Sequence, residues 1–363
     1  MMPKVRFQNK EQVPFVKELR KRVNGYFKEN KISRNANAHM VFKTITMFLI
    51  YLIPYAFLYT GLVSGVWAVF LALVMGVGMA GIGMNVMHDA NHGAYSSSPK
   101  VNNLIGICIY LIGGDVYNWK VQHNILHHTY TNIDGLDGDI HQDPFLRLSS
   151  EQSWGKGHKF QHLYAFFLYS LGTLLWSVVD FVQYRRFTKM GLSPDGKLNK
   201  PKQLRKLLLY KMAYWTFIFV LPMLFSPFAW WQVVLGWLLM NLVAGFILTV
   251  TFQLAHLVEG VAFPVPSDQG KVENEWMIHQ LKTTANFAKK SRLVTWYVGG
   301  LNFQIEHHLF PNICHVHYKK LSDIVKATAD QYGILYNDKK TYLEAVYSHY
   351  KMLKHLGVNP IVS

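Results

Sequence analysis

Histidines carry most of the chemistry that this sequence can do. The stretch "VQHNILHHTYTN", residues 121–132, holds three histidines within six residues, and the stretches "HDANH" and "QIEHH" are similar. We name these groups box 1 (His88 and His92), box 2 (His123, His127 and His128) and box 3 (Gln304, His307 and His308). An i, i+4 spacing puts two side chains on one helical face, and imidazole is a good ligand for Zn, Cu, Fe and Ni. The boxes therefore predict a metal site.

The number of histidines indicates how many ions this site holds. With His256, which ends a long apolar run, the boxes supply eight imidazoles. A zinc site takes only three or four ligands, so the count predicts two metal ions. Ferritin-like di-iron proteins use Glu-x-x-His pairs on bundle helices, a pattern that is missing here. We therefore favour an all-imidazole pair of irons with open positions for oxygen.

Two uncharged stretches must position these histidines. Half of the 363 residues are hydrophobic and 16% are charged, against about 25% in soluble domains. No charged residue lies between Lys43 and Asp89, or between Lys211 and Glu259. Each stretch is long enough for two membrane spans of about 20 residues. We predict two hairpins, with spans at about 43–63, 66–87, 209–226 and 230–256.

The remaining segments carry all 37 basic residues and give the chain a net charge of +16. By the positive-inside rule they face the cytosol, where they attract anionic lipid or an acidic partner. A nucleic-acid partner is not expected, because the basic residues are dispersed. The first apolar run starts near residue 41, which argues against a secretory signal. With two cysteines, Cys108 and Cys314, no disulfide framework is expected.

One further apolar segment has two interpretations. Residues 160–179, "FQHLYAFFLYSLGTLLWSVV", are uncharged and could form a fifth span or lie in the membrane interface. With four spans every box faces one side, whereas a fifth span would separate box 3 from the others. We therefore expect this segment to be interfacial or re-entrant. Residues 101–114 are too few to span and are expected to form a shallow or protein-buried helix.

The boxes, their order and the two hairpins resemble the membrane fatty acid desaturase family over about residues 40–320. The segments "HDANHGAYS", "HHTYTN", "DGDIHQDP" and "LNFQIEHHLFP" are similar to family segments. The resemblance implies a cytosolic di-iron centre that uses O2 to remove two hydrogens from an acyl chain. It implies iron ligands at the seven box histidines and at His256. A glutamine at position 304, where many relatives have histidine, resembles front-end desaturases and also sphingolipid-type relatives; it would ligate weakly or only hydrogen-bond a ligand.

The resemblance departs from many front-end enzymes in one respect. Those enzymes often carry a fused cytochrome b5 domain with a His-Pro-Gly-Gly heme motif, and no His-Pro pair occurs here. A separate electron donor is therefore expected, either a ferredoxin or a cytochrome b5 with its reductase. The acyl carrier, whether coenzyme A, a glycerolipid or a sphingoid base, stays open.

Residues beside the boxes are candidates for supporting roles. Metal-bound histidines usually hydrogen-bond a carboxylate or carbonyl through the other ring nitrogen, and four carboxylates lie near the boxes: Asp89, Asp137, Asp139 and Glu306. A solvated or structural role is equally expected for any one of them. Tyr117, Asn118 and Trp119 precede box 2 and are candidates for the mouth of an apolar substrate path, with packing as the alternative.

Together these inferences predict an all-α integral membrane protein with four spans, interfacial helices and a cytosolic helical cap that holds the di-iron site. We expect a basic arm (1–40), a desaturase domain (41–320) and a tail (321–363), with both termini cytosolic. The host membrane would be the inner membrane of a bacterium or the endoplasmic reticulum of a eukaryote. Three alternatives remain: a di-iron hydroxylase or ketolase, a zinc-dependent membrane hydrolase, and a metal transporter. Transporters place ligands near the bilayer midplane, unlike these boxes.

Overall fold

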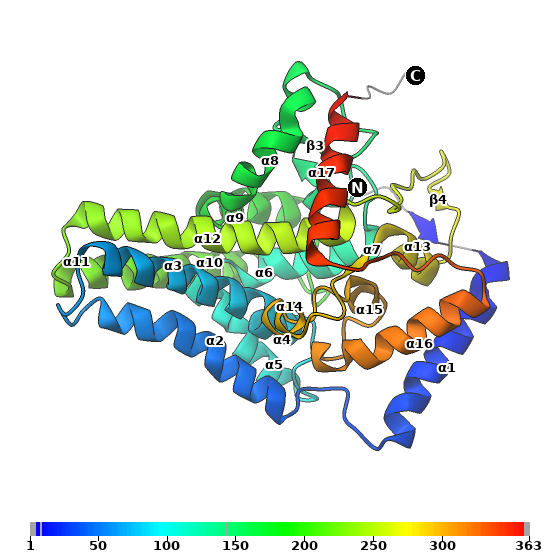
Figure 1. Ribbon diagram of the computed structural model, residues 1–363, viewed down its shortest axis with the longest axis horizontal. Coiled ribbons are helices and arrows are strands. Elements are labelled where there is room, and N and C mark those ends of the chain that lie inside the picture. The colour runs from blue at the N-terminus through cyan, green and yellow to red at the C-terminus, as the bar shows by residue number, and fades with distance from the viewer. Residues whose placement is uncertain (1–4, 8, 143, 359–363) are drawn as a thin grey trace. The chain divides into compact units, whose positions relative to one another are not determined.

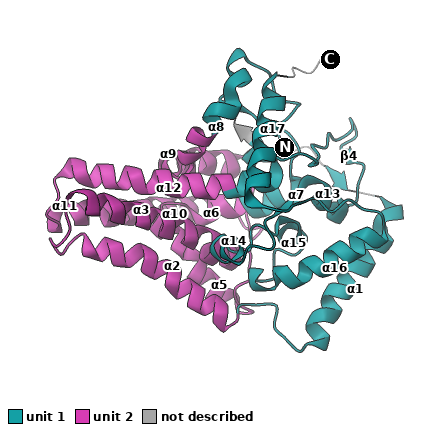
Figure 2. Ribbon diagram, viewed as in Figure 1, with its two compact units in different colours: residues 1–36, 122–165, 251–363 teal, residues 37–121, 166–250 magenta. Residues whose placement is uncertain are grey.

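The computed structural model describes residues 5–7, 9–142 and 144–358. These residues are mostly helical, and the strands among them are two residues long and pair into three small sheets. The predicted all-α fold class is confirmed. The chain divides into two compact units, each assembled from separate stretches (Figure 2): unit 1 contains 1–36, 122–165 and 251–363, and unit 2 contains 37–121 and 166–250.

Unit 2 is built around long apolar helices (Figure 1). Four helical segments among the described residues are long and apolar enough to cross a membrane, in agreement with the four predicted spans: Ala38–Phe57, Gly65–Asn91, Lys200–Phe225 and Trp230–His256. The bent pair of helices that contains residues 160–179 would be a fifth if it formed one span. Their elements are α2 (Ala38–Phe57), α3 (Gly65–Gly81) with the π-helix η2 (Ile82–Met87) and α4 (His88–Asn91), α10 (Lys200–Trp215) with the π-helix η7 (Thr216–Val220) and α11 (Leu221–Phe225), and α12 (Trp230–His256).

Two observed helices differ in extent from the predicted spans. The first span was expected over 43–63, but α2 ends at Phe57, and Gly61 turns the chain in the left-handed region with φ of 71°. The third was expected from residue 209, but α10 begins at Lys200. The Asn199 side chain starts α10 by accepting a hydrogen bond from the backbone N–H of Lys202 at 3.0 Å. Hydropathy locates the apolar part of a helix, whereas caps and turns determine its ends.

Glycines let α3 approach its neighbours closely. A Cβ atom on Gly78 would lie 2.7 Å from the backbone nitrogen of Tyr51 in α2. A Cβ atom on Gly76 would lie 2.6 Å from the carbonyl oxygen of Met240 in α12. Side chains at either position would push the backbones apart, so these glycines set the spacing of the bundle.

The segment 160–179 does not form one straight helix. It lies in α8 (Gln161–Ser170) and α9 (Gly172–Lys189), which meet at a 76° bend. The interfacial or re-entrant placement remains a prediction. The short apolar helix expected over 101–114 is present as α5 (Pro99–Gly106) and the 3-10 helix η3 (Ile107–Ile112). The chain continues through α6 (Val116–Trp119) into the π-helix η4 (Lys120–His127).

Unit 1 packs the predicted basic arm against the predicted tail. Its core joins α1 (Val13–Glu29), α13 (Trp276–Thr283), α15 (Gln304–Leu309) and α16 (Tyr318–Gln331) through buried Phe15, Leu19, Leu281, Phe303, Ile305 and Leu321. The division into arm, domain and tail remains a prediction about the sequence, because the described arm and tail residues belong to the same unit.

The other helical elements of unit 1 are short apart from the C-terminal helix: η1 (Lys10–Gln12), α7 (His128–Tyr130), η5 (Gly138–Ile140), η6 (Lys156–Phe160), α14 (Arg292–Tyr297), η8 (His315–His317) and α17 (Tyr342–Val358). The strands form three pairs: β1 (Arg6–Phe7) with β4 (Lys271–Val272), β2 (His141–Gln142) with β3 (Leu146–Arg147), and β5 (Asn286–Phe287) with β6 (Asp338–Lys339).

Candidate metal centre

Box 1 and box 2 both follow or lie within π-helical turns. The π-helix η2 ends at Met87, directly before His88, and the π-helix η4 contains His123 and His127. A π-helix bonds residue i to i+5 and therefore holds more residues per turn than an α-helix, and such turns often occur at functional sites. The i, i+4 spacing suggested ordinary α-helical faces, and the sequence carries no signal for the wider turns.

Unit 1 brings three histidines from distant parts of the chain into one buried cluster. A ligand atom from each of His127, His256 and His308 lies within 4.8 Å of the other two, and the three side chains are fully buried. Their ring centroids are 4.7 to 4.9 Å apart. Helix α12 supplies His256, η4 supplies His127, and α15 supplies His308.

Each ring of this cluster is held through its Nδ1 atom. Nδ1 of His127 lies 3.0 Å from Oδ2 of Asp137, and Nδ1 of His308 lies 2.8 Å from Oε1 of Gln280. Nδ1 of His256 lies 3.4 Å from the carbonyl oxygen of Thr283. Because all three partners accept hydrogen bonds, the proton of each ring belongs on Nδ1.

The Nε2 atoms of the same rings are buried and have no hydrogen-bond partner among the described residues. Three inward lone pairs without donors are costly in an apolar interior. A bound cation would satisfy them, with the opposite ring nitrogen hydrogen-bonded as in most metal-ligating histidines. The residues present therefore fit a metal ion.

A second cluster in unit 1 contains His123, His128 and His307. Nε2 of His128 lies 3.3 Å from Nε2 of His123 and 3.0 Å from Nε2 of His307. Imidazole nitrogens bound to one ion at about 2.1 Å and at right angles would be about 3.0 Å apart. A further grouping within 4.8 Å joins His128, His307 and His308 and so links the two clusters. Unit 1 thus offers six imidazoles in two adjacent clusters.

The electrostatic surroundings of His127 and His308 differ. Burial opposes a charge on His127, but the Asp137 carboxylate and then Asp139, 3.7 Å away, outweigh burial and raise the pKa of His127. Burial and then the neighbouring imidazoles lower the pKa of His308 well below its ordinary value. His308 therefore stays neutral, which is the form that binds metal.

Comparison with known proteins identifies the family. The sequence profile of the fatty acid desaturase family, described as "Fatty acid desaturase", matches residues 64–340. The chain belongs to the fatty acid desaturase family. It is therefore an oxidoreductase of fatty acyl chains and a membrane protein.

Several characterised relatives are similar over almost the whole desaturase. The sn-1 linoleoyl-lipid 6-desaturase of Arthrospira platensis is 35% identical over 351 residues, covering 96% of this chain and 94% of the relative. The enzyme of the same name from Synechocystis sp. is 35% identical, with 94% and 95% covered. The acyl-lipid (8-3)-desaturase of Physcomitrium patens is 33% identical and covers 97% of this chain and 73% of its own length.

The carboxylates predicted to support the desaturase boxes have different surroundings. Asp137 contacts His127 and also accepts hydrogen bonds from the backbone N–H groups of Asn132 and Asp139. Burial raises the pKa of Asp139 to about 7. Glu306, by contrast, bonds Asn286 at 2.8 Å and Tyr336 at 2.9 Å, and burial raises its pKa to about 7. Support of a ligand ring remains a prediction for each carboxylate.

Gln304 lies in the same short helix, α15, as the other two residues of box 3. Its side chain is buried, and its Oε1 atom has no hydrogen-bond partner among the described residues. An Oε1 atom without a partner among the described residues is compatible with weak ligation of a metal ion. It does not support the alternative in which Oε1 accepts a hydrogen bond from a neighbouring histidine ring. Its role as a ligand stays a prediction.

Box 1 belongs to unit 2. The rings of His88 and His92 are 4.7 Å apart between centroids, and Nδ1 of His88 lies 3.8 Å from Oδ1 of Asp89. Trp119 meets both rings edge-on, at 5.7 Å from His88 and 5.4 Å from His92. Of the three predicted substrate residues, Trp119 is therefore the one observed beside box 1.

The other two predicted substrate residues form hydrogen bonds within unit 2. The hydroxyl of Tyr117 donates to the carbonyl oxygen of Leu192 at 2.8 Å. The Nδ2 atom of Asn118 donates to the carbonyl oxygen of Asp180 at 2.8 Å. These contacts support the packing alternative for both residues, and their contact with substrate remains a prediction.

Two supporting residues were missed from the sequence. Gln280 holds His308 and also donates from Nε2 to the carbonyl oxygen of His128 at 3.1 Å. The hydroxyl of Tyr318 lies 3.2 Å from Nδ1 of His307. Neither residue lies in a box, and Gln280 is 24 residues from the nearest one, so spacing gave no signal for it.

Proposed function

We propose that this desaturase inserts a double bond into an acyl chain with two iron ions bound by the box histidines and His256, using O2 as co-substrate. The observation that supports this most directly is the convergence of three unpartnered Nε2 atoms, from His127, His256 and His308, in a fully buried cluster. We propose His88, His92 and Gln304 as further ligands, on the strength of their positions in the box pattern.

The protein's contribution is to hold neutral rings in fixed orientations and to exclude water. Bound irons would supply the oxidising power that an unactivated C–H bond requires. Asp137 orients His127, Gln280 orients His308, and the Thr283 carbonyl orients His256. Complete burial of these rings keeps solvent away from the reacting atoms.

We propose front-end regiochemistry, in which the new double bond forms between an existing one and the carboxyl end. The glutamine at the first position of box 3 supports this proposal. The names of the relatives agree, since they include 6-desaturases of linoleoyl lipids and (8-3)-desaturases of acyl lipids. An acyl lipid or acyl-CoA is the proposed substrate.

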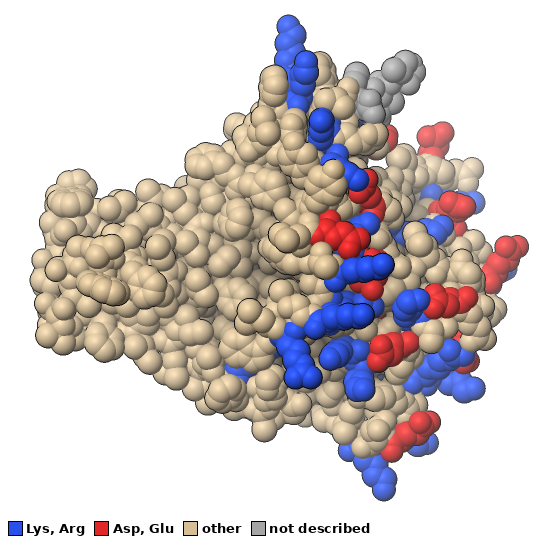
Figure 3. All heavy atoms as spheres, in the orientation of Figure 1, with Lys and Arg blue, Asp and Glu red and all other residues tan. Residues whose placement is uncertain are grey.

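A separate acidic electron carrier is the proposed partner, either a ferredoxin or a cytochrome b5 with its reductase. In the view of Figure 3, Lys and Arg side chains gather over unit 1 together with some Asp and Glu, whereas the visible long helices of unit 2 are nearly free of charge. Over the whole chain, Lys and Arg outnumber Asp and Glu by 37 to 21. A basic face would speed the encounter with an acidic carrier, and salt would slow it. We propose that this face and both termini are cytosolic.

One expression experiment tests the reaction. The desaturase is produced in a host that lacks polyunsaturated lipids, and the fatty acids are analysed for mass and double-bond position. Loss of two hydrogens at a front-end position supports the proposal, whereas gain of one oxygen would indicate the alternative hydroxylase. Metal analysis of the purified protein should give two irons per chain, and one zinc ion would contradict the di-iron centre. His127→Ala should remove the product and reduce iron binding.

A further inference from the structure

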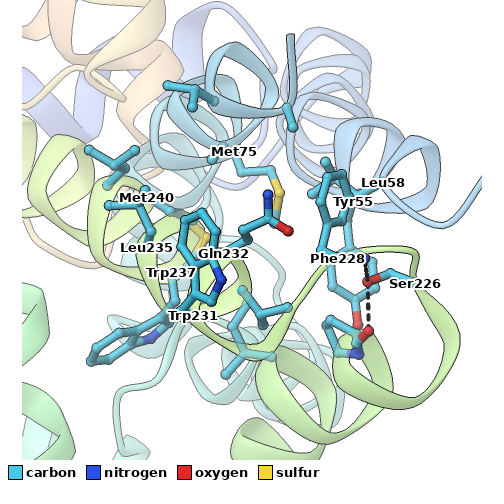
Figure 4. A pocket seen from close by; sticks show the side chains of 18 of the residues that line it. Tyr55, Leu58, Met75, Ser226, Phe228, Trp231, Gln232, Leu235, Trp237 and Met240 are labelled. Atoms are coloured by element: carbon cyan, nitrogen blue, oxygen red, sulfur yellow. Dashed lines mark hydrogen bonds between the residues drawn. The ribbon is translucent and has the colours of Figure 1, made fainter. Parts of the chain in front are cut away.

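Unit 2 contains an apolar cavity of about 300 Å³ at the end of its helices where both hairpin turns lie (Figure 4). The end of α2, the start of α3, α11 and the start of α12 form its walls. The lining residues used below are Ala68, Ala72, Met75, Gln232, Gly236 and Met240.

The cavity is as deep as one leaflet of a bilayer. Its lining on α3 runs from Gly65 to Met75, which is ten residues further along the helix or about 15 Å. The hydrocarbon core is about 30 Å thick. Trp67 and Trp230, at the same end, are 65% and 68% exposed, as expected for an aromatic belt at the membrane surface. The cavity therefore extends from the interface to about the midplane.

This location separates the cavity from box 1. Met75, the deepest lining residue on α3, precedes His88 by 13 residues along one continuous helical segment. That separation corresponds to about 20 Å. A chain bound in the cavity would therefore not place its C–H bonds at box 1.

Small residues leave the space open. A Cβ atom built on Gly236 would make an ordinary van der Waals contact with Ala72 Cβ at 3.9 Å, so the glycine leaves about one methyl group of space between α12 and α3. The deeper lining includes Ala72, Met75 and Met240, and the indole N–H of Trp237 at this level already donates to the hydroxyl of Tyr214 at 3.0 Å. An occupant must be apolar and narrow there.

Gln232 offers a hydrogen-bond donor at the shallow end of the cavity. Oε1 of Gln232 accepts from the backbone N–H of Ala229 at 2.9 Å and so caps α12. The NH2 group of the same side chain donates no hydrogen bond to any described residue, and Figure 4 shows the carboxamide among the cavity-lining side chains. An occupant that brings a carbonyl oxygen to this level would satisfy the donor.

We propose that the cavity binds one acyl chain of a glycerolipid from the leaflet at the hairpin turns, with its ester carbonyl accepting from Gln232. Gln232 is the third residue of α12, so it lies near the interface where glycerol esters lie. At about 30 Å³ per water-sized group, the volume holds about ten methylene-sized groups. The lipid is a resident ligand and not the substrate. This proposal does not depend on the iron chemistry or on the regiochemistry proposed above.

Photo-crosslinking of the full chain in nanodiscs tests the site. The probe is phosphatidylcholine with a diazirine near the end of one acyl chain, and labelled peptides are mapped by mass spectrometry. We expect labels at Ala72, Met75 and Met240, reduced at least fivefold in Ala72→Phe. Gly236→Leu fills the same space and is the second variant if Ala72→Phe folds poorly. Val66→Phe, at a side chain that is 74% exposed, is the matched control and should retain the labels.

Unchanged labelling of these positions in both filled variants would overturn the proposal, as would labelling confined to outward residues such as Phe70. A second comparison isolates the carbonyl contact. The parent should be labelled several-fold more by the ester-linked probe than by its ether-linked analogue. Gln232→Glu keeps the cap of α12 and removes the NH2 donor, so it should label equally with both. Equal labelling of the parent by the two probes would refute the role of Gln232.

Discussion

Nδ1 of His127 and Oδ2 of Asp137 lie 3.0 Å apart, and neither side chain is exposed to solvent. This contact directs the lone pair on the other nitrogen of His127 toward His256 and His308. Loss of such an outer partner typically lowers metal affinity 10- to 100-fold. We expect Asp137→Leu to lose about that much iron affinity and Asp137→Asn, which keeps an acceptor, to lose less.

Competition with a chromophoric chelator measures this affinity without any need for turnover. Asp330→Asn is the control and should keep the parent's iron affinity, because that side chain is 58% exposed and pairs with Lys326 away from the boxes. Equal iron affinity in Asp137→Leu and the parent would show that the carboxylate does not support a ligand.

Gln304 offers a test of the third box. Gln304→His supplies a better ligand of similar reach, so activity should survive at least in part. Gln304→Leu removes every ligating atom at nearly constant volume and should inactivate the desaturase. Gas chromatography of the products, with iron content measured in parallel, distinguishes the two variants. Full activity in Gln304→Leu would make this position a packing residue and would remove the support that it gives to front-end regiochemistry.

A buried ion pair stabilises unit 2. Nζ of Lys211 lies 2.6 Å from Oδ2 of Asp180, and both residues are at most 5% exposed. Removing one partner of a buried pair costs about 3–5 kcal/mol, because the other charge is left uncompensated. Lys211→Met should therefore lower the unfolding temperature in detergent more than Lys211→Met combined with Asp180→Asn. A double variant that is less stable than Lys211→Met would contradict this account.

His349 predicts how stability depends on pH. Burial lowers its pKa to about 4, and Nδ1 lies 2.8 Å from the carbonyl oxygen of Leu257. Between pH 6.5 and 4 the unfolded state binds this proton and the folded state does not, so stability falls as the pH falls through that window. The full effect is about 3 kcal/mol for a shift from 6.5 to 4. His349→Gln should flatten the pH dependence of the unfolding temperature, and His39→Gln, at an exposed position, should leave it unchanged.

The parts of this molecule that are encoded locally could be predicted from the sequence. Uncharged runs gave four span-length helices, and box spacing gave the histidines that converge in unit 1. Each single span and each histidine box lies within about 20 consecutive residues. The contacts made by Gln280 and Tyr318 depend on how distant helices pack, and packing leaves no periodic trace in one sequence. For the same reason, the sequence did not predict that α1 packs against α16.

Backbone detail was also beyond prediction. The apolar run at 160–179 is uncharged throughout, and the 76° bend between its two helices has no proline to mark it. The π-helical turns likewise contain no proline to mark them.

These turns make the site sensitive to residue count. In η4, hydrogen bonds from i to i+5 accommodate one residue more than an α-helical turn would. Deleting a single residue from this turn, even one that contacts no histidine, would let the helix relax to the α form. The flanking helices could then keep their relative register, but the ligands inside the turn would change direction relative to those outside it. Substitution scans would not reveal this constraint. The length of η4 should therefore tolerate change less than the identities of its residues that are not ligands.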